Sequence, residues 1–394
     1  MLLGEILSTL TEAQAPFTSV AVDASRLDRA GGDDVDLRWR PLAQRLGELG
    51  APPDTVEAIG RRVTSSTGRG GELSRVVVAT DAGVGLDVLL PGRPVRDEVL
   101  HGPVPHLMPV LRALSGAFRY AVVRLDRSGA DIDVVGPLGE AENSGEVEGG
   151  HDQLHKIGGG GWSQRRYQSR VEDSWEHNGA AVADELADLV RRHRPELVVV
   201  GGDEHALAEL TRHLDGDALP LVVTVDGLSR AAGADGDAQE QAVTEALDTH
   251  RTTLRHRLLD EYAQEISRQQ RAVEGLDSVV DALRRGQVRT LLLNDDPMST
   301  LQLWAGDTPL QLGLTEQDSR DAGAQQPVQA RADAVLAWAL VGSDADAVLV
   351  DAEEAELTDG LAAVLRWSDR ATAHDRVPTM PGHGEAPGAS PNVE

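Results

Sequence analysis

The segment from Leu154 to Arg170 combines residue types that could bind an anion and approach another backbone closely. It holds four consecutive glycines, one lysine, three arginines and two aromatic residues, with no acidic residue among them. Four glycines in a row cannot pack a core, and they carry a large entropic cost of ordering. Their expected use is therefore a loop tip, or a point where the chain passes close to another molecule.

Three arginines follow the glycines at the point where a helix is expected to begin. Ser163 or Gln164 can start this helix, which places the arginines in its first two turns. Cations at a helix N-terminus oppose the helix dipole, so such a cluster indicates an external anion. Phosphate is the obvious candidate because guanidinium binds it in a bidentate way, while aromatic rings stack on bases. The residues expected to contact RNA are Lys156, Gly158, Gly159, Gly160, Gly161, Trp162, Ser163, Arg165, Arg166, Tyr167 and Arg170.

The composition of the whole chain contrasts with this segment. The 394 residues include 65 acidic and 37 basic ones, for a formal net charge of −28. A general RNA-coating or anionic-membrane protein is disfavoured, since such proteins need a positive surface. The single lysine, Lys156, lies two residues before the glycines, and local charge reversal of this kind marks a nucleic-acid site. The absence of cysteine excludes disulfides, thiolate metal sites and a cysteine nucleophile.

Three other patterns could carry chemistry, and each has a simpler structural interpretation. His151 and His155 have the spacing of two metal ligands, but the sequence places no third ligand, so no metal is expected. Gly201 and Gly202 precede Asp203 as in some phosphate loops, yet the lysine of a P-loop is missing. We expect a turn there, with Asp203 as a helix N-cap. Asp126 and Asp203 could also serve a two-metal nuclease, which is the less favoured interpretation.

The elements that must position this segment indicate an α/β chain with an α+β N-terminal part. Residues 117–273 are expected to open with a hairpin, Tyr120–Leu125 and Ile132–Val135. Residues 138–153 are rich in acids and glycines and are expected to form an exposed, mobile lead-in. A long helix should follow and end before Pro195, and Leu197–Val200 should be a buried strand. The expected domains are 1–116, 117–273 with the glycine-rich loop at 157–164, 274–372, and a disordered tail at 373–394.

The termini and apolar runs give further expectations. The N-terminus lacks a basic region and has an acid at Glu5, so it is not a secretory signal. The first apolar residues have helical spacing and predict an amphipathic first helix, namely Leu3, Ile6, Leu7 and Leu10. No apolar run reaches the ~18–20 residues of a membrane span, which favours a cytoplasmic protein without membrane partners. Residues 294–330 show no clear period and are expected to be a loop-rich insertion.

Three stretches of the sequence resemble one known family. Gly160–Tyr167 is similar to the Gly-Gly-Gln loop and following helix of archaeal and eukaryotic class 1 release factors. Gly275–Leu293 is similar to the opening of the family's C-terminal domain, and Asp359–Trp367 to that domain's closing helix. The best fit is the bacterial branch, which includes Pelota-like proteins, Balon-type hibernation factors and quality-control peptidyl-tRNA hydrolases. Trp162 and Ser163 separate the last glycine from Gln164, so the tip is longer than Gly-Gly-Gln.

The resemblance implies an RNase-H-like middle domain and an L7Ae-like C-terminal domain. It also implies entry into the ribosomal A site, contact with large-subunit rRNA and peptidyl-tRNA, and Gln164 as the catalytic residue. No cofactor is expected, and help from a translational GTPase is left open. No stop-codon-reading motif is found in residues 1–116. Two function classes stay open at this point, a hydrolase that releases stalled peptides and a non-catalytic occupant of idle ribosomes. A third class is an α/β protein unrelated to ribosomes.

Overall fold

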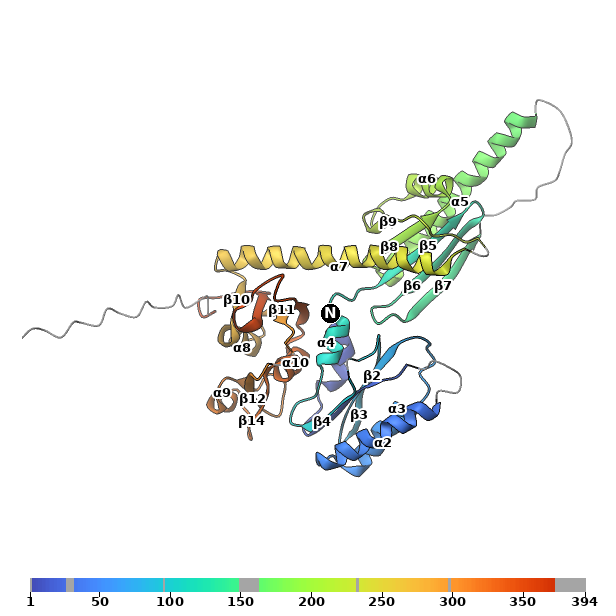
Figure 1. Ribbon diagram of the computed structural model, residues 1–394. Coiled ribbons are helices and arrows are strands. Elements are labelled where there is room, and N and C mark those ends of the chain that lie inside the picture. Colours follow the sequence, from blue (N-terminus) through green and yellow to red (C-terminus); the bar gives the residue numbers. More distant parts are fainter. Residues whose placement is uncertain are drawn as a thin grey trace, which may run out of the picture. The chain divides into compact units, whose positions relative to one another are not determined.

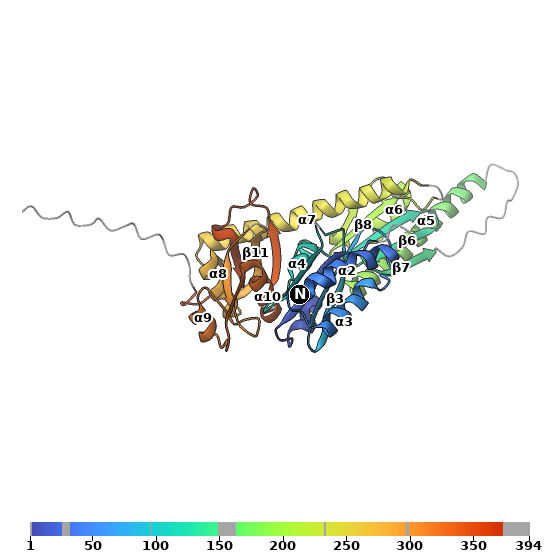
Figure 2. The ribbon, with the colours of Figure 1, turned by 60° about the horizontal axis from the view of Figure 1, so that its bottom comes forward.

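The computed structural model describes residues 2–25, 32–94, 96–148, 163–231, 234–296 and 299–372. By internal contacts the chain separates into two compact units, whose elements are shown in Figures 1 and 2. One unit spans residues 12–258, and the other combines residues 3–11 with the chain from residue 259 onward. The domain boundaries predicted at residues 116 and 273 stay predictions. Within the described residues, no helix is long and apolar enough to cross a membrane.

The first unit begins with an antiparallel sheet of strand order β3-β2-β1-β4. Its strands are β1 (Phe17–Asp23), β2 (Leu73–Thr80), β3 (Gly83–Pro91) and β4 (Glu98–Gly102). The helices of this part are α2 (Gly32–Glu48), α3 (Pro53–Thr64) and α4 (Met108–Leu114). Helices α2 and α3 bury Leu46 and Ile59 against Val20 and Val77 of the sheet. Burial of this apolar face is what holds the layer together.

The second sheet of this unit has the strand order β7-β6-β5-β8-β9. Its strands are β5 (Tyr120–Asp126), β6 (Gly129–Val135), β7 (Ala141–Glu148), β8 (Leu197–Gly202) and β9 (Val222–Thr224). The pairs β7–β6 and β6–β5 are antiparallel, whereas β5–β8 and β8–β9 are parallel. This meander followed by parallel strands is the RNase-H-like arrangement, so the predicted fold of the middle part is confirmed.

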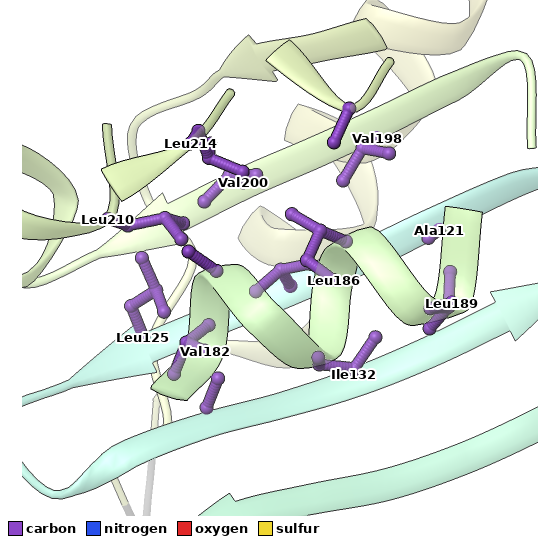
Figure 3. Packing of buried hydrophobic residues seen from close by; sticks show 14 of the residues in the cluster. Ala121, Leu125, Ile132, Val182, Leu186, Leu189, Val198, Val200, Leu210 and Leu214 are labelled. Carbon is purple, nitrogen blue, oxygen red and sulfur yellow. The ribbon is translucent and has the colours of Figure 1, made fainter. Parts of the chain in front are cut away.

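Helices cover both faces of the second sheet. They are α5 (Ser163–His193), α6 (Glu204–His213) and α7 (Gly236–Ser267), and a 3₁₀ turn, η2 (Leu219–Leu221), precedes β9. On one face α5 and α6 pack Leu186 and Leu210 against Ile132 and Val200 (Figure 3). On the other face Leu247 of α7 packs with the alternate residues of the strands. Successive strand residues point to opposite faces, so β5 and β8 are apolar on both.

The second unit is also α/β. Its main sheet has the order β10-β16-β11-β15, and a small sheet has the order β13-β12-β14. The strands are β10 (Ala272–Glu274), β11 (Val288–Asn294), β12 (Gln302–Ala305), β13 (Leu312–Gly313), β14 (Val328–Arg331), β15 (Asp346–Val350) and β16 (Leu361–Leu365). The helices are α8 (Leu276–Arg284), α9 (Glu316–Asp321), α10 (Ala332–Ser343) and the 3₁₀ turn η3 (Thr358–Gly360). The predicted α/β fold class is confirmed.

Two predictions for this unit are wrong. The stretch Asp359–Trp367 was expected to be a closing helix, but Leu361–Leu365 is strand β16 with all five residues buried. The strand lies between β10 and β11, and a run that is apolar on both faces carries no period that distinguishes strand from helix. Residues 294–330 were expected to be loop-rich, yet their described part forms β12–β14 and α9.

The N-terminal helix belongs to the second unit rather than to the sheet that follows it. It comprises α1 (Leu2–Leu7) and the 3₁₀ turn η1 (Ser8–Leu10), and Leu7 and Leu10 are both 0% exposed. A Cβ placed on Gly4 would lie 2.7 Å from Asp344 Oδ1, so the helix closely approaches the end of α10. The predicted amphipathic helix is confirmed, and its apolar face completes a core formed by the far end of the chain.

Truncation of Leu7 should therefore weaken the second unit. We expect Leu7→Ala to cost roughly 2–5 kcal/mol, the usual range for a fully buried leucine. Native-state hydrogen exchange at the β11 amides would report this loss in the second unit directly. Leu37→Ala is the control, because Leu37 is 59% exposed. Unchanged protection of β11 in the Leu7 variant would contradict the assignment of α1 to this unit.

Candidate functional site

The glycine-rich segment, defined here as residues 149–162 between β7 and α5, leads directly into helix α5. Lys156, the four glycines and Trp162 lie outside the described residues, so their predicted contacts stay predictions. Ser163 is the first residue of α5, which confirms the predicted helix start. The remaining predicted residues lie in the first turns of this helix, namely Gln164, Arg165, Arg166, Tyr167 and Arg170. Arg166 and Arg170 are four residues apart and therefore share one helical face.

The first part of α5 forms an arm that extends beyond the sheet. Among the α5 residues whose burial is described, from His177 onward, Asn178, Gly179, Val182 and Leu186 are buried. The α5 arm is defined here as the 15 residues before Asn178, which span about 22 Å at 1.5 Å per residue. Figures 1 and 2 show this arm projecting past the end of the strands. The predicted catalytic and RNA-contacting residues of α5 are thus carried away from the core.

Two residues fix the point at which the α5 arm leaves the sheet. The Asn178 side chain is 8% exposed, and its Nδ2 donates a hydrogen bond to the carbonyl oxygen of Arg127 at 2.7 Å. Gly179 lies directly against α6, where an added Cβ would be 2.7 Å from the Cβ of Glu209. The missing side chain at Gly179 therefore allows the two helices to approach closely.

Strand β7 leads into the glycine-rich segment from the other side. Residues 138–148 were expected to be a mobile lead-in, and this part of the prediction is wrong, because Ala141–Glu148 pairs with β6 along its length. Acids are frequent on exposed edge strands, where they discourage pairing with other chains. Here arginines from other elements compensate them. Arg119 donates to Glu142 at 2.7 Å, and Arg230 donates to Glu146.

Arg230 contacts three carboxylates at the end of the sheet where β5 turns into β6. Besides Glu146 of β7, it contacts Asp126 at 2.9 Å and Asp131 at 2.9 Å, and its side chain is 9% exposed. Burial raises the pKa of Asp126, but hydrogen bonds from Ser128 and the charge of Arg230 outweigh it and hold this pKa below 3.8. Burial lowers the pKa of Arg230, yet its carboxylate partners raise it above the ordinary arginine value. The Asp126 carboxyl is therefore ionised at neutral pH.

The other predicted sites have structural explanations. Asp203 N-caps α6 by accepting hydrogen bonds from the backbone N–H groups of His205 and Ala206, as expected. Asp126 accepts hydrogen bonds within its own turn, so both carboxylates of the nuclease alternative have structural partners. His151 and His155 lie outside the described residues. Among the residues that are described, no group of three or more metal-ligating side chains is found.

Asn178 and Arg230 were missed by the sequence reasoning. Asn178 did carry a signal, since an Asn-Gly pair is typical of turns and is unusual inside a long helical pattern. Its presence there indicates a packing requirement. Arg230 carried no such signal, because its partner Asp126 is 104 residues away in the sequence and Glu146 is 84 residues away.

Comparison with known proteins agrees with this architecture. Residues 119–268 match the sequence model of bacterial archaeo-eukaryotic release factor family 2. An uncharacterized protein of Mycobacterium tuberculosis, Rv2629, is 27% identical over 378 residues, covering 93% of this chain and 97% of the relative. A Pelota homolog of Natronomonas pharaonis is 23% identical over 41% of this chain and 47% of its own length. The resemblance predicted from the sequence, to the bacterial branch of these release factors, is confirmed.

Solved structures of related proteins show more distant similarity. Pelota of Archaeoglobus fulgidus aligns with a TM-score of 0.34 and 14% identity, covering 76% of this chain and 85% of its own. Dom34 of Saccharomyces cerevisiae aligns with a TM-score of 0.37 and 11% identity, covering 76% and 81%.

The Asp126 cluster gives a pH-dependent contribution to stability. Because the pKa of Asp126 is below its usual 3.8, stabilisation is fully present above about pH 4 and is lost as the pH falls through the lowered value. Asp126→Asn should lower the free energy of unfolding by about 1 kcal/mol at pH 7, since the carboxylate is partly exposed and screened. This difference from the wild type should shrink as the pH falls from 4 through the lowered pKa, as measured by urea unfolding. A difference that is constant with pH would contradict this account.

Proposed function

We propose that this protein enters the ribosomal A site and promotes hydrolysis of peptidyl-tRNA on stalled ribosomes. The observation that carries the proposal is the position of Gln164. It lies in the first turn of α5, directly after a glycine-rich segment and at the far end of an arm on an RNase-H-like sheet. The sheet lies within the part of the chain that matches the release factor family. A narrow projection of this kind suits a deep, RNA-lined site.

Gln164 would act by orienting water rather than by removing its proton. An amide has no useful pKa near neutrality, so it cannot serve as a general base. Its side chain and backbone N–H can hold a water molecule against the ester carbonyl and donate to the developing oxyanion. Gly158–Gly161 would allow close approach to the end of the tRNA, because glycine has no side chain to obstruct contact.

The basic and aromatic residues would hold the tip against RNA. Lys156 would neutralise rRNA phosphates together with Arg165, Arg166 and Arg170, while Trp162 and Tyr167 would stack on bases. Two relatives support a ribosomal partner, since archaeal Pelota has been described bound to the ribosome with ABCE1, and Dom34 as interacting with Hbs1. We include a helper GTPase in the proposal on the same basis. With these partners the protein would act in the cytoplasm.

A second candidate function is occupancy of idle ribosomes without catalysis. The observation that favours it is the separation of Gly161 from Gln164 by Trp162 and Ser163, which moves the glutamine away from the glycines. A bulky tryptophan at that point would fill space in the site that a reacting ester needs. Both candidates require ribosome binding, and only the first requires peptide release.

Release of peptide from stalled ribosomes tests the catalytic role of Gln164. We expect Gln164→Ala to lower the single-turnover release rate by about 100-fold or more, the usual effect of removing one oxyanion donor. Gln168→Ala is a matched control, because it makes the same chemical change one helical turn later. Ribosome binding should be unchanged in both variants, as followed by cosedimentation. Equal release by the wild type and Gln164→Ala would exclude the catalytic role, and binding without release by the wild type would favour occupancy.

The salt dependence of binding tests the RNA contacts of the arm. Each phosphate contact that is lost should reduce the slope of log affinity against log salt by roughly 0.7–0.9. Arg166→Gln and Arg170→Gln should each show this reduction and weaken ribosome binding. Arg192→Gln, in the last turn of the same helix, carries the same charge change and should have no effect. Identical slopes for all three variants would contradict phosphate binding by the arm.

A further inference from the structure

Both elements that flank the glycine-rich segment are tied to one turn. This turn joins β5 to β6 and is called the turn anchor here, comprising residues Asp126–Gly129. The α5 arm is held to it by Asn178, whose Nδ2 donates to the carbonyl oxygen of Arg127 at 2.7 Å. Strand β7 is held to it by Arg230, which contacts both Glu146 of that strand and Asp126 of the turn. The two connections come from distant parts of the chain. They meet at two consecutive residues of the turn, because Asn178 bonds to Arg127 and Arg230 contacts Asp126.

The turn anchor is held by hydrogen bonds of its own. The Oδ1 atom of Asp126 accepts hydrogen bonds from Ser128 N at 2.7 Å, from Ser128 Oγ at 2.6 Å and from Gly129 N at 3.1 Å. Gly129 has a φ of 154°, in a region that side-chain-bearing residues rarely adopt. The flanking strands pair along their whole length from Tyr120 to Val135. A residue that bonds to this turn is therefore held in place relative to the sheet.

Because the α5 arm is long, a small change of angle at its base produces a large displacement of its first residue. Because the arm is about 22 Å long, a tilt of 10° at Asn178 would move its first residue by about 4 Å. Reacting groups in a catalytic site must be placed to within about 1 Å, and a misplacement of that size can cost 100-fold in rate. Binding through flexible arginine side chains tolerates far larger displacements. Angular freedom at the base would thus affect the chemical step much more than it affects binding.

We infer that Asn178 and Arg230 are positioning residues, which lock both elements beside the glycine-rich segment to the turn anchor and so fix the direction of the α5 arm. The inference rests on the proposed function for its catalytic consequence. Its structural part is independent of that function, since the direction of the arm can be measured in the free protein.

The experiment uses the full-length chain, which has no cysteine of its own. Two cysteines are introduced, Ser169→Cys on the α5 arm and Thr224→Cys on the exposed part of β9, and both are spin-labelled. Electron–electron double resonance then gives the distribution of distances between arm and sheet. We expect a single narrow distribution in the otherwise wild-type protein, and a broad one after Asn178→Ala or Arg230→Met. Arg230→Lys, which keeps the charge but cannot bridge the carboxylates, should be intermediate.

The same substitutions are tested on stalled ribosomes without labels. We expect Asn178→Ala and Arg230→Met to lower the saturating release rate by between about tenfold and 100-fold. The protein concentration that gives half-saturation should change by less than about threefold, which a globally destabilised protein would not show. The matched control is Arg192→Gln, which removes one arginine from an exposed ion pair with Glu185 on the same helix. It should leave both the release rate and the distance distribution unchanged.

The outcomes separate this inference from the proposed function. Unchanged distance distributions in all anchor variants would overturn the inference, whatever the ribosome does. Broadened distributions with an unchanged release rate would overturn the catalytic consequence. If the wild-type protein releases no peptide, the proposed function fails, and the distance distributions alone then decide whether Asn178 and Arg230 direct the arm.

Discussion

Apolar packing of the second half of α5 against β5, β6 and β8 holds the candidate site in place. Val182, Leu186, Leu189 and Val190 are all buried against this sheet, and each contributes on the order of 1.5–3 kcal/mol when fully removed from water. This packing begins one turn after Asn178 and continues to the end of the helix. The arm before it can project because the helix is already secured over about three turns. Hydrogen bonds and charge at the base of the arm, through Asn178 and Arg230, add to this packing in directing the projection.

Electrostatic compensation at the sheet end complements the packing. Asp126, Asp131 and Glu146 meet there on β5, β6 and β7, and without compensation these three carboxylates would repel one another. Arg230 contacts all three, while Arg119 bonds to Glu142 near the other end of β7. The ionised forms of Asp126 and Glu142 are favoured, since the pKa of each carboxyl is lowered. For Glu142 the hydrogen bond from Arg119 is the largest cause. The acidic edge strand is therefore an ordered part of the sheet rather than a solvated tail.

Some elements of this fold can be predicted from neighbouring residues, whereas others depend on contacts between residues far apart in the sequence. The hairpin β5–β6, the strand β8, the start and end of α5 and the cap at Asp203 were all predicted, because each follows from neighbouring residues. The strand nature of β7 and β16 was not predicted. For β7 the acids suggested disorder, and their partner Arg230 lies far along the chain. For β16 a short apolar run has no distinguishing period. The placement of α1 in the second unit likewise depends on contacts across the whole chain.

The candidate site was predictable only in part for the same reason. Gln164 and the arginines were recognised from composition and spacing within a few residues, and the structure adds their place on α5. The residues that direct the arm, Asn178 and Arg230, act through contacts formed only in the folded chain. Local sequence thus identifies the residues that could do chemistry. Which residues orient the arm that carries them depends on the tertiary fold.

The arm also resolves the conflict between a net charge of −28 and a proposed RNA partner. Electrostatic forces between exposed charges decay over a Debye length of about 8 Å at physiological salt. An arm of about 22 Å separates its first residues from the sheet by more than two such lengths. The arginines at the start of α5 therefore interact with phosphate almost independently of the acids on the body. The same acids repel RNA wherever the body itself comes close, so contact is favoured at the tip alone. Length, rather than overall charge, is what would let an acidic protein probe an RNA-lined site.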